Sequence, residues 1–126
     1  MITVLPVENP ERLAALYEAA GLVQPADGGG VEAKDGEESL GYCLYRFNEE
    51  AMTVLALEPA SDRLMADGVL RSALHVAVTR GIPAAYYGDT APVQLFRSLG
   101  FIKNDENREL DIGKLFSSCK NCEAGR

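Results

Sequence analysis

Apolar residues recur along the chain with two different periods, which predict helices and strands in alternation. An apolar run at residues 2–7 predicts a strand, and the apolar spacing within residues 9–22 predicts a helix. Asn9 is a favoured N-cap, Pro10 suits the first helical position, and Gly21 suits the position just past the last turn. The first two elements are therefore a strand followed by a helix.

The next segment is rich in Gly, Asp and Pro and predicts a loop. Within residues 23–39, only residues 31–34 carry a weak strand pattern, and we expect them to form an edge strand closed by a turn at Gly36. Two clearer strands follow. Residues 39–47 carry apolar side chains on both alternating faces, and residues 51–59 form the continuous apolar run typical of a buried strand.

The second half of the chain predicts further helices and strands in turn. The expected elements are a helix at 66–80, a strand at 82–88, a helix at 89–99 and a brief strand at 101–104. Residues 110–119 fit either a strand or a closing helix, and we favour the helix. Gly81 and Gly100 end the first two of these helices. Asp89 or Thr90 would cap the second helix, and Asp111 the third. This order predicts an α+β (mixed α/β) domain built on a single sheet.

The length and composition indicate one globular domain with a short tail. A chain of 126 residues, with 47% hydrophobic and 25% charged residues, can bury a core without metals or disulfides. We expect the domain to span residues 1–118 and residues 119–126 to form a tail that contains cysteines. No apolar run approaches the roughly 20 residues of a membrane span, and no secretion signal is evident. Three cysteines, an odd number, argue against a secreted disulfide framework, so we expect a cytoplasmic protein.

The charged residues are unevenly distributed between the two halves of the chain. A net charge of −7 argues against a nucleic-acid partner, because phosphate contacts need clustered Lys and Arg. Residues 1–60 hold 11 acidic and three basic residues, whereas residues 61–126 hold eight acidic and nine basic residues. A cationic ligand would therefore suit the first half and an anionic ligand the second. A solvated acidic surface is the alternative explanation.

The middle of the chain carries a recognisable succession of motifs. A strand ending in "LALEP" precedes a turn with Gly68, a long helix ending in "RGI", a strand, and a short helix ending in "LFRSLGF". Over residues 39–103 this succession resembles the GCN5-related N-acetyltransferase (GNAT) superfamily, in which the last motif usually reads "FYEKLGF". The resemblance implies a single mixed, mostly antiparallel sheet with helices on both faces. It also implies transfer of an acetyl group from acetyl-CoA to an amine.

The same resemblance implies where acetyl-CoA or another acyl-CoA would bind. In the family, the pyrophosphate lies at a helix N-terminus beside the motif Gln/Arg-x-x-Gly-x-Gly/Ala, and the best fit here is Arg63-x-x-Ala66-x-Gly68. Asp67 would cap the helix but repel a phosphate, a charge that Arg71 could offset. The family's pantetheine arm bonds to the strand before this motif. The residues expected to bind the cofactor are Leu55, Leu57, Arg63, Ala66, Asp67, Gly68, Val69 and Arg71.

Amine acetylation needs a base for the ammonium proton and an acid for the leaving thiolate. The family's acid tyrosine aligns with Phe96, which has no proton to give, so another donor must act. Tyr86 and Tyr87 are adjacent on a predicted strand and point to opposite faces, so one of them could reach a cleft. Asp89 stands where the family often has Asn. Glu58 lies at the end of a strand, at a position from which some family members supply a general base. The catalytic candidates are Glu58, Tyr86 and Asp89, each of which could instead be an ordinary exposed or packed residue.

Two other reactive features form no complete site in the sequence. His75 is the one histidine, and it lies on the polar stripe of the long helix, where we expect it to be solvated. Cys119 and Cys122 have the spacing of a metal-ligand or redox pair. A structural zinc site needs four ligands and the chain offers no second pair, so we expect no metal.

Three functions remain open at the level of the sequence. The first is an N-acetyltransferase that acts on an unknown amine. The acidic first half of the chain would suit an amine that is cationic. The second is an inactive GNAT-fold module that binds a ligand or partner, suggested by Ala66, Asp67 and Phe96. The third is a metal- or redox-responsive protein that uses Cys119 and Cys122. We expect no nucleic-acid or membrane partner, and an open strand edge would allow a homodimer.

Overall fold

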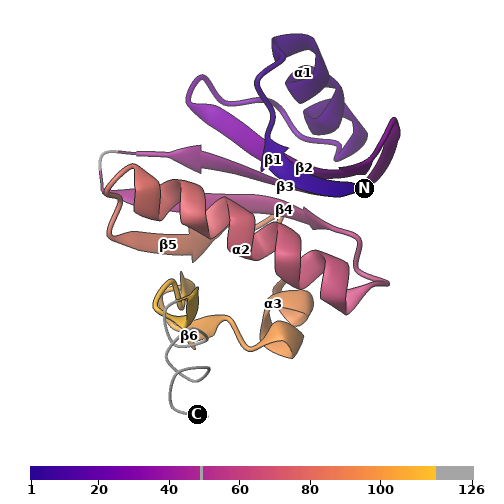
Figure 1. Cartoon of the computed structure of the whole chain (residues 1–126). Helices are drawn as coiled ribbons and strands as arrows, with labels where there is room; N and C mark the ends of the chain where they lie inside the picture. The colour runs from indigo at the N-terminus through magenta and orange to yellow at the C-terminus, as the bar shows by residue number, and fades with distance from the viewer. Residues whose placement is uncertain (49, 116–126) are drawn as a thin grey trace.

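Seven strands form one mixed sheet in the part of the chain that the structure describes. The computed structural model describes residues 1–48 and 50–115, and the strand order is β1-β2-β3-β4-β5-β7-β6 (Figure 1). The strands are β1 (Ile2–Pro6), β2 (Gly28–Asp35), β3 (Glu38–Phe47), β4 (Ala51–Glu58), β5 (Ala84–Tyr87), β6 (Ile102–Asn104) and β7 (Glu109–Leu110). Neighbouring strands are antiparallel except β4 and β5, which are parallel.

Helices cover both faces of this sheet, which confirms the predicted fold class. They are α1 (Pro10–Ala19), α2 (Arg63–Thr79) and α3 (Val93–Leu99). In Figure 1, α2 lies across the front of the sheet, and its Leu70 and Leu74 are buried in one core together with Phe96 of α3. α1 packs on the other face, where Tyr17 meets Leu44 of β3. Within the described residues, no helix is long and apolar enough to cross a membrane.

The first helix begins and ends as the sequence predicts. The Oδ1 atom of Asn9 accepts hydrogen bonds from the amides of Glu11 (2.8 Å) and Arg12 (3.1 Å), with Pro10 at the first helical position. Gly21 has a φ of 74°, the left-handed conformation that favours glycine after a helix end. The strands predicted at the N-terminus, in the centre and on either side of α3 are also confirmed, as β1, β3, β4, β5 and β6.

The segment predicted as a loop with a short edge strand is instead an inner strand. β2 pairs with β1 on one side and with β3 on the other. A Cβ atom on Gly28 would lie 2.8 Å from Tyr17 Oη, and one on Gly29 would lie 2.9 Å from Tyr45 Cε1. The glycines are therefore packing residues that leave room for two buried tyrosines. The prediction was wrong because a run of glycines is also what a loop requires.

The longest helix begins earlier than predicted, at Arg63 instead of residue 66. The carboxylate of Asp62 accepts a hydrogen bond from the Met65 amide at 3.2 Å, so Asp62 and not Asp67 is the N-cap. Asp67 lies in the second turn, where it forms an ion pair with Arg71 at 2.7 Å. Each aspartate is followed two and three positions later by apolar residues, so the sequence pattern does not distinguish them.

The two later helix predictions also differ from the structure. α3 begins at Val93, and its N-cap residue, Pro92, makes no side-chain hydrogen bond, so neither Asp89 nor Thr90 caps it. Leu110, in the segment for which we favoured a closing helix over a strand, ends β7, which pairs with β5 and β6. Among the described residues, helical ones follow only at Lys114 and Leu115. Residues 116–119 of that expected helix lie outside the described residues.

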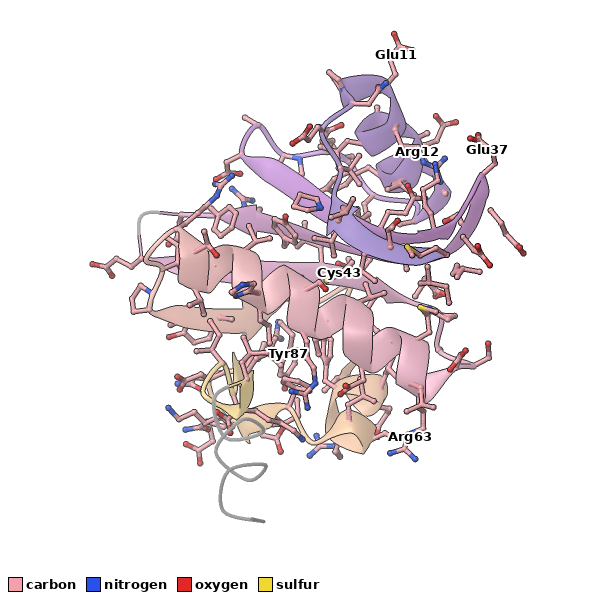
Figure 2. The ribbon with its side chains drawn as sticks, in the orientation of Figure 1. Glu11, Arg12, Glu37, Cys43, Arg63 and Tyr87 are labelled. Carbon is pink, nitrogen blue, oxygen red and sulfur yellow. The ribbon has the colours of Figure 1, made fainter. Side chains whose placement is uncertain are left out.

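A buried carboxylate connects α1 to the sheet. The Glu32 side chain of β2 is 5% exposed and accepts hydrogen bonds from Arg12 Nε (3.1 Å) and Ser39 Oγ (2.7 Å). A second guanidinium nitrogen of Arg12 completes a two-point contact, and Figure 2 shows Arg12 where α1 approaches the strands. The hydrogen bond from Arg12 holds the pKa of Glu32 below its usual value; burial opposes this effect and Ser39 adds to it.

The variant Glu32→Gln should destabilise the fold mainly at neutral pH. The loss of the charge should lower the free energy of unfolding near pH 7 by roughly 1–3 kcal/mol. Because the folded-state pKa of Glu32 is depressed, its stabilisation is present above the unfolded-state value of about 4.3 and is lost as the pH falls through the folded-state value. Urea unfolding near pH 7 and near pH 3 measures the difference between wild type and variant.

The matched control for this prediction is Glu37→Gln, which removes a carboxylate from the exposed turn between β2 and β3. We expect the control to change stability little at either pH. A Glu32→Gln effect that is the same at both pH values, or no larger than that of the control, would contradict the assigned role of the buried pair.

Candidate functional site

β4 and β5 separate at one end of their pairing. The parallel pairing runs from Ala51 to Val54 of β4, and the amide of Gly88 then donates a hydrogen bond to the Val54 carbonyl at 2.9 Å. β4 continues to Glu58, whereas β5 has already ended at Tyr87. The last four residues of β4 thus have a partner strand only on the β3 side, within the described residues.

A β-bulge in β4 coincides with this separation. Leu44 of β3 pairs with Ala56, but the next residue of β3 pairs with Val54, so Leu55 is an extra residue on β4. Such a bulge bends a strand and turns its side chains, and bulges are frequent next to active sites. The hydroxyl of Thr90 donates a hydrogen bond to the Leu55 carbonyl at 2.8 Å. This bond holds the loop after β5 against the bulge.

A cavity of about 330 Å³ opens beside the gap between the two strands. Its lining residues come from the end of α1, from β3, from the end of β4 and from the loop after β5: Ala19, Ala20, Tyr42, Ala56, Leu57, Glu58, Thr90 and Pro92. Three of the eight lining residues are alanines, and Tyr42, Glu58 and Thr90 supply the polar side chains of a mainly polar surface. The cavity has the size of a small-ligand site with a few polar groups.

Tyr42 and Glu58 lie directly opposite each other on β3 and β4, so their side chains share one face of the sheet. A Cβ atom on the neighbouring Gly41 would lie 2.5 Å from the Glu58 carbonyl oxygen and 2.8 Å from Pro59 Cδ. Glycine therefore allows β3 to approach the end of β4 closely at this point. Burial and the charge of Glu58 together raise the pKa of Tyr42, which thus keeps its proton at neutral pH.

The sequence-based search for catalytic residues missed Tyr42. The pairing of Phe47 with Met52 sets the register next to the turn, and its simple extension would place Tyr42 opposite Leu57. The bulge shifts the register by one residue and brings Tyr42 opposite Glu58. The short turn between two apolar runs was the available signal, because it indicates a hairpin that brings residue 42 close to the end of the next strand.

Of the three predicted catalytic residues, only Glu58 lines the cavity. Tyr86 lies in β5 between Thr53 of β4 and Glu109 of β7. Asp89 is exposed and forms an ion pair with Arg108, on the side of β5 away from β4. The structure thus brings Glu58 together with Tyr42 and Thr90 rather than with the other two candidates.

The position aligned with the family's acid tyrosine belongs to the core. Phe96 is fully buried, and its ring centroid lies 5.9 Å from that of Tyr87. Tyr87 is partly buried against the same core, which also contains the apolar face of α2. Any proton donor in the cavity must therefore come from another position.

The N-terminus of α2 presents groups that can bind an anion. Within the described residues, the amides of Arg63 and Leu64 have no acceptor, whereas Asp62 caps the Met65 amide. The Arg63 guanidinium donates a hydrogen bond to the Ser98 carbonyl of α3 at 2.8 Å, and Figure 2 shows Arg63 at this end of the helix. Free amides at a helix N-terminus and a guanidinium are both groups that bind phosphate.

Leu55 and Leu57 lie in β4, and the other residues predicted to bind the cofactor lie inside α2 rather than in a turn before it. Ala66 and Val69 are fully buried in the core. Gly68 is helical, and a Cβ atom placed on it would meet no atom within 4 Å. The charge of Asp67 is compensated by Arg71. The helix is therefore open to solvent at Gly68, while its unbonded amides lie about one turn earlier.

The other reactive residues named from the sequence do not join this site. His75 is exposed on α2, as expected. Cys43 is buried in β3, and its burial raises the pKa of its thiol, which makes it a poor nucleophile. Cys119 and Cys122 lie outside the described residues.

Comparison with known proteins identifies the fold. No protein-family model matches the sequence, and no curated protein is significantly similar to it. The structure of ribosomal-protein-S18-alanine N-acetyltransferase from Escherichia coli is similar with a TM-score of 0.58 and 14% identity, covering 86% of this chain and 88% of that protein. The structure of an IAA acetyltransferase from Bacillus cereus is similar with a TM-score of 0.56 and 17% identity. The match covers 78% of this chain and 75% of that protein.

A GNAT-family protein from Desulfovibrio desulfuricans is similar as well, with a TM-score of 0.55 and 13% identity. The match covers 79% of this chain and 83% of that protein. These likenesses show that the chain has the fold of the GNAT acetyltransferases. They confirm the architecture that the motifs between residues 39 and 103 had indicated.

Proposed function

We propose that the chain is an N-acetyltransferase that uses acetyl-CoA to acetylate an amine. The observation that carries the proposal is the separation of β4 from β5 at the Leu55 bulge, beside a cavity with Glu58 and Tyr42 on its wall. A strand edge without a partner offers amide and carbonyl groups to a ligand, and the cavity offers space for a small reacting group. The fold shared with acetyltransferases supports the same function by analogy.

In this proposal, the acyl donor lies along the gap and ends at the N-terminus of α2. The backbone of β4 from Leu55 to Leu57 would hydrogen-bond the amide groups of the pantetheine arm. The amides of Arg63 and Leu64, with the Arg63 guanidinium, would hold the pyrophosphate. Gly68 would allow a close approach, because no side chain covers the helix there.

Glu58 would act as the general base that takes the proton from the incoming ammonium, directly or through one water molecule. Acetyl-CoA would supply the thioester carbonyl that the free amine attacks. The C–S bond would break as the C–N bond forms, and the proton lost by the attacking nitrogen would pass to the departing thiolate through the Tyr42 hydroxyl. Tyr42 keeps its proton at neutral pH, so its hydroxyl can donate a hydrogen bond to the departing sulfur. The buried Phe96 has no such group, and Tyr86 does not line the cavity.

The acceptor that suits this cavity is a compact primary amine. The carboxylate of Glu58 would attract an ammonium group, and the first 60 residues carry 11 acidic and three basic side chains. Ala19, Ala20 and Ala56 form the wall beside Glu58 and leave room for an amine with a slim substituent.

The binding half of the proposal can be tested with the variant Gly68→Ala. Alanine in place of a half-buried helical glycine with free space beside it should raise the free energy of unfolding by about 0.5–1 kcal/mol. The same methyl group should weaken CoA binding, because it occupies the open surface along which the phosphates approach. Calorimetric titration of the full chain with acetyl-CoA and CoA measures the affinity, and urea unfolding measures the stability.

Thr79→Ala, at the far end of α2, is the matched control and should leave CoA affinity unchanged. The absence of any binding heat with millimolar acetyl-CoA in the wild type would rule out the proposed co-substrate. An unchanged CoA affinity in Gly68→Ala would remove Gly68 from the binding site.

The catalytic half can be tested with Glu58→Gln and Tyr42→Phe. Each should lower the rate of acetyl transfer by about 100-fold, because each removes a proton-handling group, while acetyl-CoA binding remains. Tyr86→Phe and Asp89→Asn should leave the rate near that of the wild type, since neither residue lines the cavity. Mass spectrometry of acetylated product measures transfer to a panel of polyamines, aminoglycosides and peptide amines.

Two results would count against this assignment. A normal rate in Glu58→Gln would exclude Glu58 as the base. Binding of acetyl-CoA by the wild type without transfer to any amine of the panel would favour a ligand-binding module that lacks transfer activity.

A further inference from the structure

A second cavity lies where β2 begins and β3 ends. It has a volume of about 350 Å³, within the range of small-molecule sites, and we call it the β2–β3 cavity. It shares no lining residue with the cavity beside the β4–β5 gap. Segments far apart in the sequence enclose it: residues 6–8 at the end of β1, Leu13 of α1, residues 27–30 at the start of β2, the end of β3 and the end of α2.

Tyr45 supplies a polar group in this cavity that no described residue uses. The side chain lines the cavity and is only 3% exposed. The backbone carbonyl of Tyr45 accepts a hydrogen bond from Tyr17, but the Tyr45 hydroxyl makes none within the described residues. No described side-chain nitrogen or oxygen is fully enclosed without a partner, so this hydroxyl must open into the cavity. Burial raises the pKa of Tyr45 to about 12, which makes the hydroxyl a neutral donor at neutral pH.

Arg80 places a positive charge close to this hydroxyl. Its guanidinium carbon lies 4.4 Å from the centroid of the Phe47 ring, and the rings of Phe47 and Tyr45 meet with centroids 5.4 Å apart. The charge of Arg80 opposes the rise in the pKa of Tyr45, which indicates that the two groups are near each other. Arg80 forms no ion pair with a described carboxylate. Stacking uses the face of the guanidinium and leaves its N–H groups for an acceptor.

Acidic residues line the same cavity, so a simple anion does not suit it. Glu8 and Asp27 are both lining residues. Asp27 shares its charge with Arg46, 3.5 Å away, whereas Glu8 forms no ion pair within the described residues. Arg80 would attract an anion that Glu8 repels, and the reverse holds for a cation. A small molecule that carries both charges is attracted by both residues.

The rest of the cavity surface is backbone and apolar side chain. The glycines at residues 28–30 bring the β2 backbone to the cavity without side chains. A Cβ atom on Gly29 would lie 2.9 Å from Tyr45 Cε1 and 3.5 Å from the Tyr45 hydroxyl oxygen, so glycine keeps this edge of the tyrosine uncovered. Leu13 and Val76 add aliphatic surface, which a ligand with a short aliphatic group would cover.

We propose that the β2–β3 cavity binds a free zwitterionic amino acid with a short aliphatic side chain. Its carboxylate would pair with Arg80 and accept a hydrogen bond from the Tyr45 hydroxyl. Its ammonium group would lie near Glu8, and its side chain would contact Val76. The site is separate from the proposed acetyltransferase site and does not depend on that function.

The probe for this site is L-leucine, titrated into the full chain at millimolar concentration. Calorimetry gives the affinity, and chemical-shift mapping should show the largest amide changes in residues 6–8, 27–30 and 45–47. Tyr45→Phe should weaken leucine binding by about fivefold and retain the fold, because it removes only a hydroxyl that no described residue uses. Arg80→Gln should weaken binding by about tenfold or more, because it removes a charge-assisted contact.

Tyr86→Phe is the matched control and should bind leucine as the wild type does, since Tyr86 lines neither cavity. N-acetyl-L-leucine and L-leucinamide each lack one of the two charges, and each should bind about tenfold more weakly than leucine or worse. An affinity for either compound equal to that for leucine would overturn the proposal.

Three further results would also overturn it. One is the absence of leucine binding by the wild type, and another is equal leucine affinity in Tyr45→Phe and the wild type. The third is a set of amide changes centred on Tyr42 and Glu58, which would make leucine a ligand of the cavity beside the β4–β5 gap instead. Failure of acetyl-CoA to bind would leave the leucine result unaffected, because the two cavities share no residue.

Discussion

The extra residue at Leu55 is the constraint on which the candidate site depends. An uninterrupted β4 would continue its register with β3, and Tyr42 would face Leu57 instead of Glu58. The bulge coincides with the end of the β5 pairing at Val54, which leaves the last residues of β4 with one partner strand in the described structure. A single inserted residue thus brings the two polar side chains together beside the gap that opens where β5 ends.

The surrounding packing fixes the walls of the cavity around this bulge. Gly41 allows β3 to approach the end of β4, where any larger residue would meet the Glu58 backbone. The buried contact between Glu32 and Arg12 fastens α1 to β2, and the last turn of α1 supplies the alanines of the opposite wall. Thr90 closes the third side through its hydrogen bond to the Leu55 carbonyl. Each wall therefore rests on contacts between segments far apart in the sequence.

This dependence on distant contacts explains what could be predicted from the sequence. α1, β3, β4 and β5 follow from local signals, namely caps, end glycines and apolar periodicity, and Glu58 follows from its place at a strand end. β2 was missed because its glycines are required only by Tyr17 and Tyr45, which a local pattern cannot show. Tyr42 was missed because its register with Glu58 depends on a bulge that leaves no sequence signature. The cap of α2 was misplaced because two aspartates fit the same pattern.

The account makes its central claim about where an acyl-CoA lies, and locating bound CoA tests that claim most directly. In ¹⁵N-labelled protein titrated with CoA, we expect the largest amide shift changes in the last four residues of β4 and in the first turn of α2. β1 (Ile2–Pro6) should change little. Largest changes elsewhere, with no response at the gap between β4 and β5, would contradict the assignment of this gap as the acyl-CoA site.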